Sequence, residues 1–478
     1  MNRFVTYFAL LALATWLLLL ASCAEDKLYS GPDRPLAFST DTLRFDTVFT
    51  AKGTASRSFK IYNPYRNPMI IQRITHGNPV FRLNIDGRSC DSVSNLRIEA
   101  HDSLRVLVQA YIDPTDDTRP LREEDVVAFY CNGQRQQVAL QVFGRNVMRV
   151  QGWRLVRDTV FDASRPILVQ DSLVVAEGVH LRLDPGVVMY FEKKASMVVY
   201  GTLQCAGTRE APVLMRGDRS DYMNTVPPLN YDQASAQWQG IWFKPGSVGN
   251  LLDGLVMRNS TWGVRVEADN TDQLALCLRN SKLSNASGNL MTVSGARVQF
   301  ENSLFYNAGG YVLNLSGGDC QACYCTFANY YGFSWGGRNC AIVRHANFDW
   351  DAAGNPVGKP LNLQVANSIV YGSWKMELSK DSLGTAPLNY QYTNCLLKVK
   401  ASAIDGHYAS CVYEDPKFVF LDWDEDAPAF EYDFHIGSAS AAIGKAKHAM
   451  AASYPFDLDG NSRTSDGSSD IGCYEFTR

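Results

Sequence analysis

The chain has 478 residues, a formal net charge of −4, 20% charged residues and 12% aromatic residues. This charge balance argues against a nucleic-acid-binding protein, which needs an excess of Lys and Arg, and the apolar content argues against intrinsic disorder. A chain of this length can form two or more folded domains.

The first 22 residues (1–22) have the features of a secretory signal peptide. Arg3 provides a positive charge, and an apolar run over residues 4–20 is followed by small residues before Cys23. The motif at residues 20–23, Leu-Ala-Ser-Cys, resembles the lipobox of bacterial lipoproteins, which implies that Cys23 is diacylated and attaches the protein to a membrane. The alternative is an ordinary signal peptide or anchor helix that ends at this cysteine by chance.

Residues 23–34 are predicted to be a tether. Glu25 and Asp26 follow Cys23 directly, and acidic residues at this place resemble sorting signals of Gram-negative lipoproteins. For a β-rich chain we expect a lipid-anchored protein of the outer membrane at the cell surface, with the periplasmic face as the alternative. We also expect a monomer without a nucleic-acid partner.

Residues 35–147 are predicted to form a β-sandwich. Apolar and polar residues alternate in short segments separated by Asn-Pro and Asp-Pro turns, namely 42–49, 58–62, 104–108 and 138–142. This order resembles the immunoglobulin-like module that precedes the β-helix of many bacterial surface lipoproteins. Cys90 and Cys131 could pair within such a sandwich, but the spacing alone leaves their disulfide state open. We expect the module to act as a spacer and N-terminal cap.

An Asn-Ser motif returns on a regular spacing in the middle of the chain. Asn259, Asn280 and Asn302 are 21 and 22 residues apart, and Tyr324 takes the same place 22 residues later. A repeat of this length, with short β-prone segments and turn glycines, is typical of one coil of a parallel β-helix. We predict that residues 150–420 form this helix and that the three asparagines stack in a ladder. The alternative is that Asn-Ser is merely common in turns.

The segments between residues 179 and 243 support this interpretation. They place an apolar strand, an Asp-Pro-Gly turn, a second apolar strand, Val-Tyr-Gly-Thr-Leu and Trp-x-Gly-Ile-x-Phe in that order. The order resembles the first coils of right-handed parallel β-helix surface lipoproteins of Gram-negative bacteria. The resemblance covers residues 35–478 and implies a pectate-lyase-like solenoid, but it does not imply an activity.

The C-terminal residues 421–478 are predicted to be a cap. Asp-Leu-Asp-Gly-Asn-Ser-Arg at 457–463 and Asp-Ile-Gly-Cys-Tyr-Glu at 470–475 resemble the closing motif of the same lipoproteins. The resemblance implies that Arg463 pairs with an acid and closes the last coil. A calcium loop is the alternative, although its twelfth position is Ser468 where glutamate is required.

Aromatic residues gather where the repeat becomes irregular. The predicted ligand-binding residues are Tyr331, Trp335, Trp350 and Trp374. Aromatic rings beside carboxylates suit saccharides, because the apolar face of a sugar packs on a ring while its hydroxyl groups need acceptors. The alternative is that these rings cover the interior of the solenoid.

The signals for catalysis and metal binding are weaker. A polysaccharide lyase or glycoside hydrolase needs a paired acid and base, and Asp349, Asp351 and His345 are the one cluster in the predicted solenoid that could serve. Cys320, Cys323, Cys325 and Cys340 are interpreted as packing residues, with zinc as the alternative. We expect no cofactor.

The sequence therefore predicts an all-β protein: an immunoglobulin-like β-sandwich, a right-handed parallel β-helix and a C-terminal cap. The predicted function is binding of a glycan or another surface macromolecule, without catalysis. The alternatives are a polysaccharide lyase or glycoside hydrolase, and a structural component of the envelope.

Overall fold

The computed structural model describes residues 28–29, 31–54, 56–89, 91–115, 120–219, 221–223, 230–332, 337–421 and 432–477. Cys23, Cys90 and Trp335 lie outside these ranges. The chain divides into two compact units, Met1–Asn146 and Val147–Arg478. None of the helices in the described ranges is long and apolar enough to span a membrane.

The first unit is a β-sandwich of two five-stranded sheets. One sheet has the order β1 (Ala37–Phe38), β3 (Arg57–Tyr62), β8 (Ser103–Ala110), β5 (Phe81–Ile85) and β6 (Arg88–Ser89). The other has the order β2 (Thr42–Phe49), β10 (Gln134–Arg145), β9 (Leu121–Cys131), β4 (Met69–Thr75) and β7 (Ser92–Ile98). All pairs are antiparallel except β2 with β10.

The alternating sequence of these strands produces the sandwich core. In β3, Phe59 and Ile61 are buried while Lys60 between them is exposed, because successive side chains of a strand point to opposite faces. Phe59 packs edge-on against Phe129 from the other sheet, with ring centroids 6.1 Å apart. Cys131 is a buried free thiol that donates to the carbonyl of Ile70. The predicted β-sandwich is confirmed.

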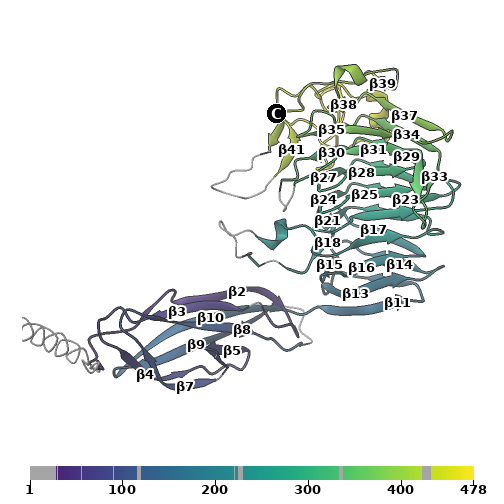
Figure 1. The fold of residues 1–478 in the computed structure, drawn as a ribbon. Coiled ribbons are helices and arrows are strands. Elements are labelled where there is room, and N and C mark those ends of the chain that lie inside the picture. The colour runs from purple at the N-terminus through teal and green to yellow at the C-terminus, as the bar shows by residue number, and fades with distance from the viewer. Residues whose placement is uncertain are drawn as a thin grey trace, which may run out of the picture. The chain divides into compact units, whose positions relative to one another are not determined.

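The second unit is a parallel β-helix with three faces, here called A, B and C (Figure 1). Each coil passes from face C to face A and then to face B. Face A contains β15 (Val188–Phe191), β18 (Val213–Gly217), β21 (Leu255–Arg258), β24 (Lys282–Ala286), β27 (Leu304–Ala308), β30 (Thr326–Asn329), β35 (Ile369–Gly372) and β38 (Leu396–Leu397). Face B contains β16 (Ser196–Val199), β19 (Gly240–Phe243), β22 (Val264–Glu267), β25 (Met291–Ser294), β28 (Leu313–Ser316), β31 (Val343–Ala346) and β36 (Leu378–Asp381).

Face C forms a separate ten-stranded sheet. It contains β12 (Thr159–Phe161), β14 (His180–Leu183), β17 (Thr202–Ala206), β20 (Asn250–Asp253), β23 (Leu274–Arg279), β26 (Arg297–Glu301), β29 (Gly318–Cys323), β34 (Leu361–Ala366), β37 (Leu388–Thr393) and β39 (Tyr408–Ala409). Two long strands, β11 (Met148–Leu155) and β13 (Ile167–Val175), begin the sheet of faces A and B. The remaining elements are η1 (Tyr231–Gln233), β32 (Phe348–Trp350), β33 (Pro356–Gly358), η2 (Ala401–Ala403), β40 (Phe418–Phe420), β41 (Asp433–Ile436) and η3 (His448–Ala452).

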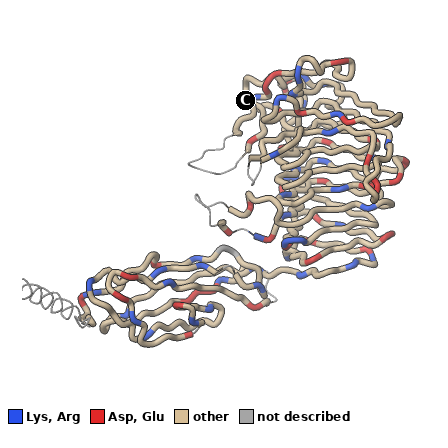
Figure 2. Tube along the Cα trace, in the orientation of Figure 1, with Lys and Arg blue, Asp and Glu red and all other residues tan. Residues whose placement is uncertain are grey.

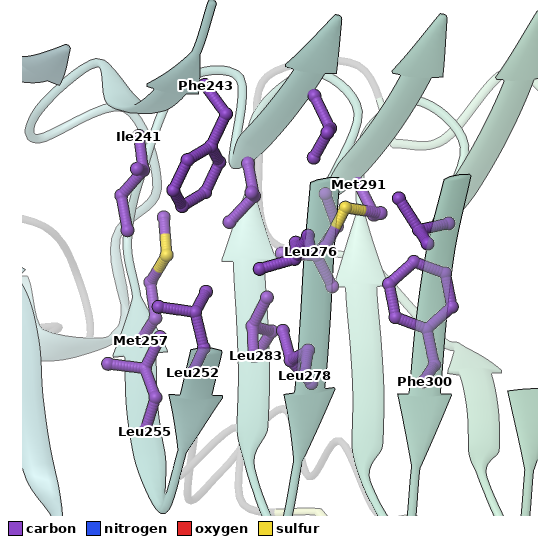
Figure 3. Packing of buried hydrophobic residues seen from close by; sticks show 14 of the residues in the cluster. Ile241, Phe243, Leu252, Leu255, Met257, Leu276, Leu278, Leu283, Met291 and Phe300 are labelled. Atoms are coloured by element: carbon purple, nitrogen blue, oxygen red, sulfur yellow. The ribbon is translucent and has the colours of Figure 1, made fainter. Parts of the chain in front are cut away.

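The coils stack in register, so like residues form columns inside the helix. One column on face A runs through Met257, Leu283, Phe305 and Phe327, all of them buried. The rings of Phe305 and Phe327 stack with centroids 4.9 Å apart. Figure 3 shows how such side chains fill the space between the faces. The predicted all-β class with an N-terminal sandwich and a parallel β-helix is confirmed.

The asparagines of the predicted ladder occupy two corners of the helix, which corrects the sequence interpretation. Asn302 Nδ2 donates to Asn280 Oδ1 at 2.9 Å, at the corner between faces C and A. Asn259 lies at the corner between faces A and B, where Asn285 Nδ2 donates to its Oδ1 at 2.9 Å. All four residues have positive φ, a conformation that asparagine tolerates better than most residues. Each corner therefore favours asparagine, and the three predicted residues do not form one ladder.

The C-terminal segment runs back along face A. An apolar cluster joins it to β27 and β30 through Leu304, Ala328, Phe434, Leu458, Cys473 and Tyr474. A second cluster further along the helix comprises Ile369, Leu396, Ile436, Ala442 and Ile471. The cap therefore covers the side of several coils.

Arg463 fastens this segment to the corner between faces C and A. Its buried guanidinium donates to Glu475 Oε1 at 2.6 Å and to Asn302 Oδ1 at 2.7 Å, and lies 4.0 Å from the centre of the Tyr324 ring. The predicted pairing of Arg463 with an acid is confirmed. Because its other contacts, Asn302 and Tyr324, belong to the middle coils, Arg463 does not close the last coil.

Replacing Asn302 with Ala is expected to lower the free energy of unfolding by about 1–3 kcal/mol, because a buried donor of Arg463 loses its acceptor. Urea unfolding followed by tryptophan fluorescence measures this change. Asn394→Ala is the matched control, since Asn394 has a similar φ of 50° but its amide donates to Lys445 O at an exposed position. Equal losses in both variants would show that backbone conformation alone sets the cost.

Candidate functional site

A groove of about 810 Å³ lies on face A, between the loop that follows β18 and the C-terminal segment. Its floor comes from the outward residues of β21, β24 and β27. Arg258, Ser284 and Tyr306 occupy matching positions of these three strands. Because their inward neighbours fill the core, alternation directs these three side chains to the outer surface. The floor is therefore fixed by the register of the core.

Three asparagines line the groove at the corner between faces A and B. Asn259, Asn285 and Asn307 all have positive φ. Asn259 Nδ2 donates to the carbonyl of Asp232 at 2.8 Å, and Asn285 Nδ2 donates to the carbonyl of Gln233 at 2.7 Å. These bonds hold the loop that carries η1 against the edge of face A.

Asp232 is the ionic anchor of this loop. Arg258 donates to both of its carboxylate oxygens, at 2.9 and 2.7 Å, and Arg216 Nη1 lies 2.9 Å from Oδ1. Burial lowers the pKa of Arg216. The two guanidinium groups together fix the position of this carboxylate.

The opposite side of the groove is aromatic. Tyr306 on the floor lies 5.0 Å from Phe434 between ring centroids, and Tyr432 stacks with Phe434 at 5.9 Å with an angle of 7° between the rings. Phe420, which is 44% exposed, and Tyr474 also line this side. Phe434 and Tyr474 are almost fully buried, so the ring surface open to the groove comes from Tyr306, Tyr432 and Phe420, a surface suited to the apolar faces of sugar rings.

His435 joins two carboxylates at the same wall. Its Nε2 lies 2.7 Å from Asp459 Oδ2, its Nδ1 is hydrogen-bonded to Asp433 Oδ1, and its ring stacks on Tyr474 at 3.9 Å. The hydrogen bond to Asp459 is the main cause that raises the pKa of His435, and the same bond lowers the pKa of Asp459. Lys282 Nζ lies 3.7 Å from Asp459 Oδ1.

This charge arrangement suits binding better than glycoside hydrolysis. A hydrolase needs a carboxylic acid whose pKa is raised so that it can donate a proton to the leaving group. The pKa of Asp459 is lowered, and Asp232 is held by two arginines. Figure 2 shows Lys and Arg interspersed with Asp and Glu over the coils of the helix.

The predicted ligand-binding residues are not brought together. Tyr331 lines the groove, where its hydroxyl is 2.7 Å from Ser235 Oγ. Trp374 lies one coil further along the same corner, with Arg338 5.2 Å from its ring. Trp350 belongs to the hairpin of β32 and β33, which follows face B, and is 59% exposed. Trp335 lies outside the described residues.

The structure does not bring together His345, Asp349 and Asp351, the one cluster that could have served an enzyme. His345 points into the helix, where its Nε2 is 2.6 Å from Tyr392 Oη and burial lowers its pKa to about 4. Asp349 instead accepts from Ser294 Oγ, and Asp351 caps its own turn by accepting from the backbone of Ala353 and Asn355. A histidine inside the core cannot share a substrate with two surface carboxylates.

Cys320, Cys323 and Cys325 of the cysteine motif are buried, whereas Cys340 is half-buried. Cys320 and Cys325 lie in the apolar core, and Asp457 accepts from the backbone of Asp459, Asn461 and Glu475. Across the described ranges, no group of three or more His, Cys, Asp or Glu side chains is arranged to hold a metal ion.

The sequence did not point to Tyr306, Lys282, Tyr432 or His435. Lys282 and Tyr306 precede Tyr432 and His435 by more than a hundred positions along the chain, and no local motif joins the two pairs. Alternation within β24 and β27 places Lys282 and Tyr306 on the outer surface, but only after the inward residues of each strand have been identified.

Comparisons with known proteins add no functional assignment. No protein-family model matches the chain, and no curated protein matches it. Among solved structures, the E. coli chaperone DraB is 10% identical over 25% of this chain, with a TM-score of 0.17, and the chain spans 56% of its length. A family 123 glycoside hydrolase from Clostridium perfringens is 6% identical over 24% of this chain and 30% of its own, with a TM-score of 0.18.

One further match extends over more of the chain. The catalytic domain of a GH87 alpha-1,3-glucanase is 8% identical over 75% of this chain and 87% of its own, with a TM-score of 0.15. Similarity at this level carries no argument about activity.

The contribution of His435 to stability is expected to fall as pH rises. Because the folded-state pKa is raised above the ordinary value of 6.5, this contribution is complete below about pH 6.5 and is lost as pH rises through the folded-state pKa. The difference in melting temperature between the wild type and His435→Gln should therefore shrink from acidic to alkaline pH. His407→Gln removes an exposed contact with Asp405 and is the control. A difference that grows with pH would contradict this assignment.

Proposed function

We propose that the protein binds a saccharide in the groove on face A. The observation that carries this proposal is the convergence of stacked aromatic rings with amide and charged side chains in one groove of about 810 Å³. Tyr306, Tyr432 and Phe420 offer ring surfaces to sugar carbons, and the buried ring of Phe434 packs against Tyr306 and Tyr432. Lys282 and Asp433 place a donor and an acceptor near them, as sugar hydroxyl groups require.

The same groove supports a binding function without turnover. The carboxylates at its walls are engaged by His435, Lys282 and two arginines. A saccharide would exchange some of its water contacts for these polar groups while its apolar faces cover the rings. The walls are tied to the floor by Asn285 and by the ion pair of Arg258 with Asp232, so little ordering is needed on binding.

The signal-like residues 1–22 and the lipobox-like residues 20–23 support a location at a membrane. We propose that Cys23 carries the lipid and that the protein is anchored in the outer membrane, at the cell surface. Metabolic labelling with a radioactive fatty acid is expected to mark the wild type, while Cys23→Ala should lose the label because the thiol at position 23 that would take the diacylglyceryl group is removed. Retained label in Cys23→Ala would reject this site of lipidation.

Tyr306→Ala is expected to weaken saccharide binding about tenfold, or about 1.4 kcal/mol, because it removes the ring at the floor of the groove. A glycan array with the protein from residue 24 onward would find the ligand, and titration calorimetry would give the dissociation constants. Trp350→Ala is the matched control, because this exposed ring lies outside the groove.

Three outcomes would contradict the binding proposal. Loss of affinity in Trp350→Ala alone would move the site to the hairpin, and absence of binding to any glycan would reject a saccharide ligand. Release of reducing ends or of ultraviolet-absorbing unsaturated sugars would show that the groove is an enzyme site.

A further inference from the structure

One corner of the β-helix carries a hydroxyl or thiol in each of six successive coils. Each side chain donates to the carbonyl two residues before it, at distances of 2.6 to 3.6 Å. Each follows a residue with positive φ. The members of this ladder are Ser281, Ser303, Cys325, Ser368, Cys395 and Cys411.

The last two rungs are both cysteines. Thr393 pairs with Ala409 and Leu396 with Val412, so Cys395 lies opposite Cys411 in the parallel ladder. Neighbouring strands are about 4.7–4.9 Å apart, which falls within the Cα separation of about 4.4–6.8 Å found in disulfides. Cys325, in contrast, has Ser303 and Ser368 on the adjacent rungs.

The two thiols differ in access and acidity. Cys395 is fully buried, and burial raises its pKa well above the ordinary value. Cys411 is partly exposed, and a hydrogen bond with the Cys395 side chain is the main cause that lowers its pKa. The backbone of Cys395 is a further cause that lowers the pKa of Cys411. An accessible thiol of lowered pKa beside a buried one suits thiol–disulfide exchange.

We propose that Cys395 and Cys411 form a reversible disulfide that joins the last coil to the coil before it. The Cys411 thiolate attacks one sulfur of an external disulfide and releases one thiol, which leaves a mixed disulfide on Cys411. Cys395 then loses its proton and attacks the Cys411 sulfur, which releases the second thiol. Two protein thiols are oxidised and one external disulfide is reduced to two thiols.

The position of the pair gives the bond a consequence. β38 and β39 contain two residues each and lie at the ends of their sheets. Such edge strands open more readily than strands paired on both sides. The bond would therefore protect the end of the helix against fraying, and the predicted export of the protein would place it where disulfides persist.

The test treats the purified full-length protein with oxidised glutathione, followed by alkylation and peptide mass spectrometry. We expect one cross-linked peptide pair containing Cys395 and Cys411, lighter by two hydrogens than the reduced pair, and a rise in melting temperature that dithiothreitol reverses. Slower proteolysis between these residues should accompany it.

Two variants make the result specific. Cys411→Ser should abolish the cross-link and the melting shift while preserving the fold, because serine already occupies three rungs of this ladder. Cys325→Ser, elsewhere in the ladder, should retain both effects. A melting shift that persists in Cys411→Ser, or a glutathione adduct on Cys411 that Cys395 does not displace, would overturn the proposal.

Discussion

The structure depends on the stacking of one coil on the next in register. Backbone hydrogen bonds between coils pair Met257 with Leu283 and Leu283 with Phe305, so each inward side chain meets a partner of similar character. A slip of one residue would turn the whole apolar set outward. The same bonds therefore fix the outward columns, including Arg258, Ser284 and Tyr306. The strands whose inward residues form the core therefore form the floor of the groove with their outward residues.

The walls come from the parts of the chain that do not repeat. The loop with η1 is inserted between faces A and B, and the C-terminal segment returns along face A after the last coil. Ion pairs hold both walls. Two arginines bind Asp232 in the loop with η1, and Glu475 binds Arg463 in the C-terminal segment. The regular coils thus supply a rigid surface, and the inserted segments give it the concave shape that a ligand site needs.

The sequence predicted the fold well and the site poorly, for related reasons. Alternation and the Asn-Ser repeat report local backbone constraints, which a β-helix repeats in every coil. The repeat did not reveal which corner of the coil each asparagine occupies, because both corners of face A favour asparagine at positive φ. Asn259 to Asn285 is one coil of 26 residues, whereas the step from Asn259 to Asn280 crosses from one corner to the other. Alternation in β31 does place His345 inward, beside Tyr392.

The buried charge of Arg463 explains why the C-terminal segment has one position. Burying an ion pair costs desolvation that can offset its attraction, so such a pair is weak evidence for stability. Apolar contacts alone would allow the segment to shift by one coil, since face A offers apolar residues in every coil. Arg463 contacts the amide oxygen of Asn302 in one coil and the ring of Tyr324 in the next coil. At the same corner, the coil after Asn280 carries Asn302, and the coil after Asn367 carries Asn394. These neighbouring coils therefore lack the amide oxygen followed by an aromatic ring that Arg463 contacts. The pair therefore sets the register of the segment, and with it the place of Phe434, His435 and Tyr474 above the groove.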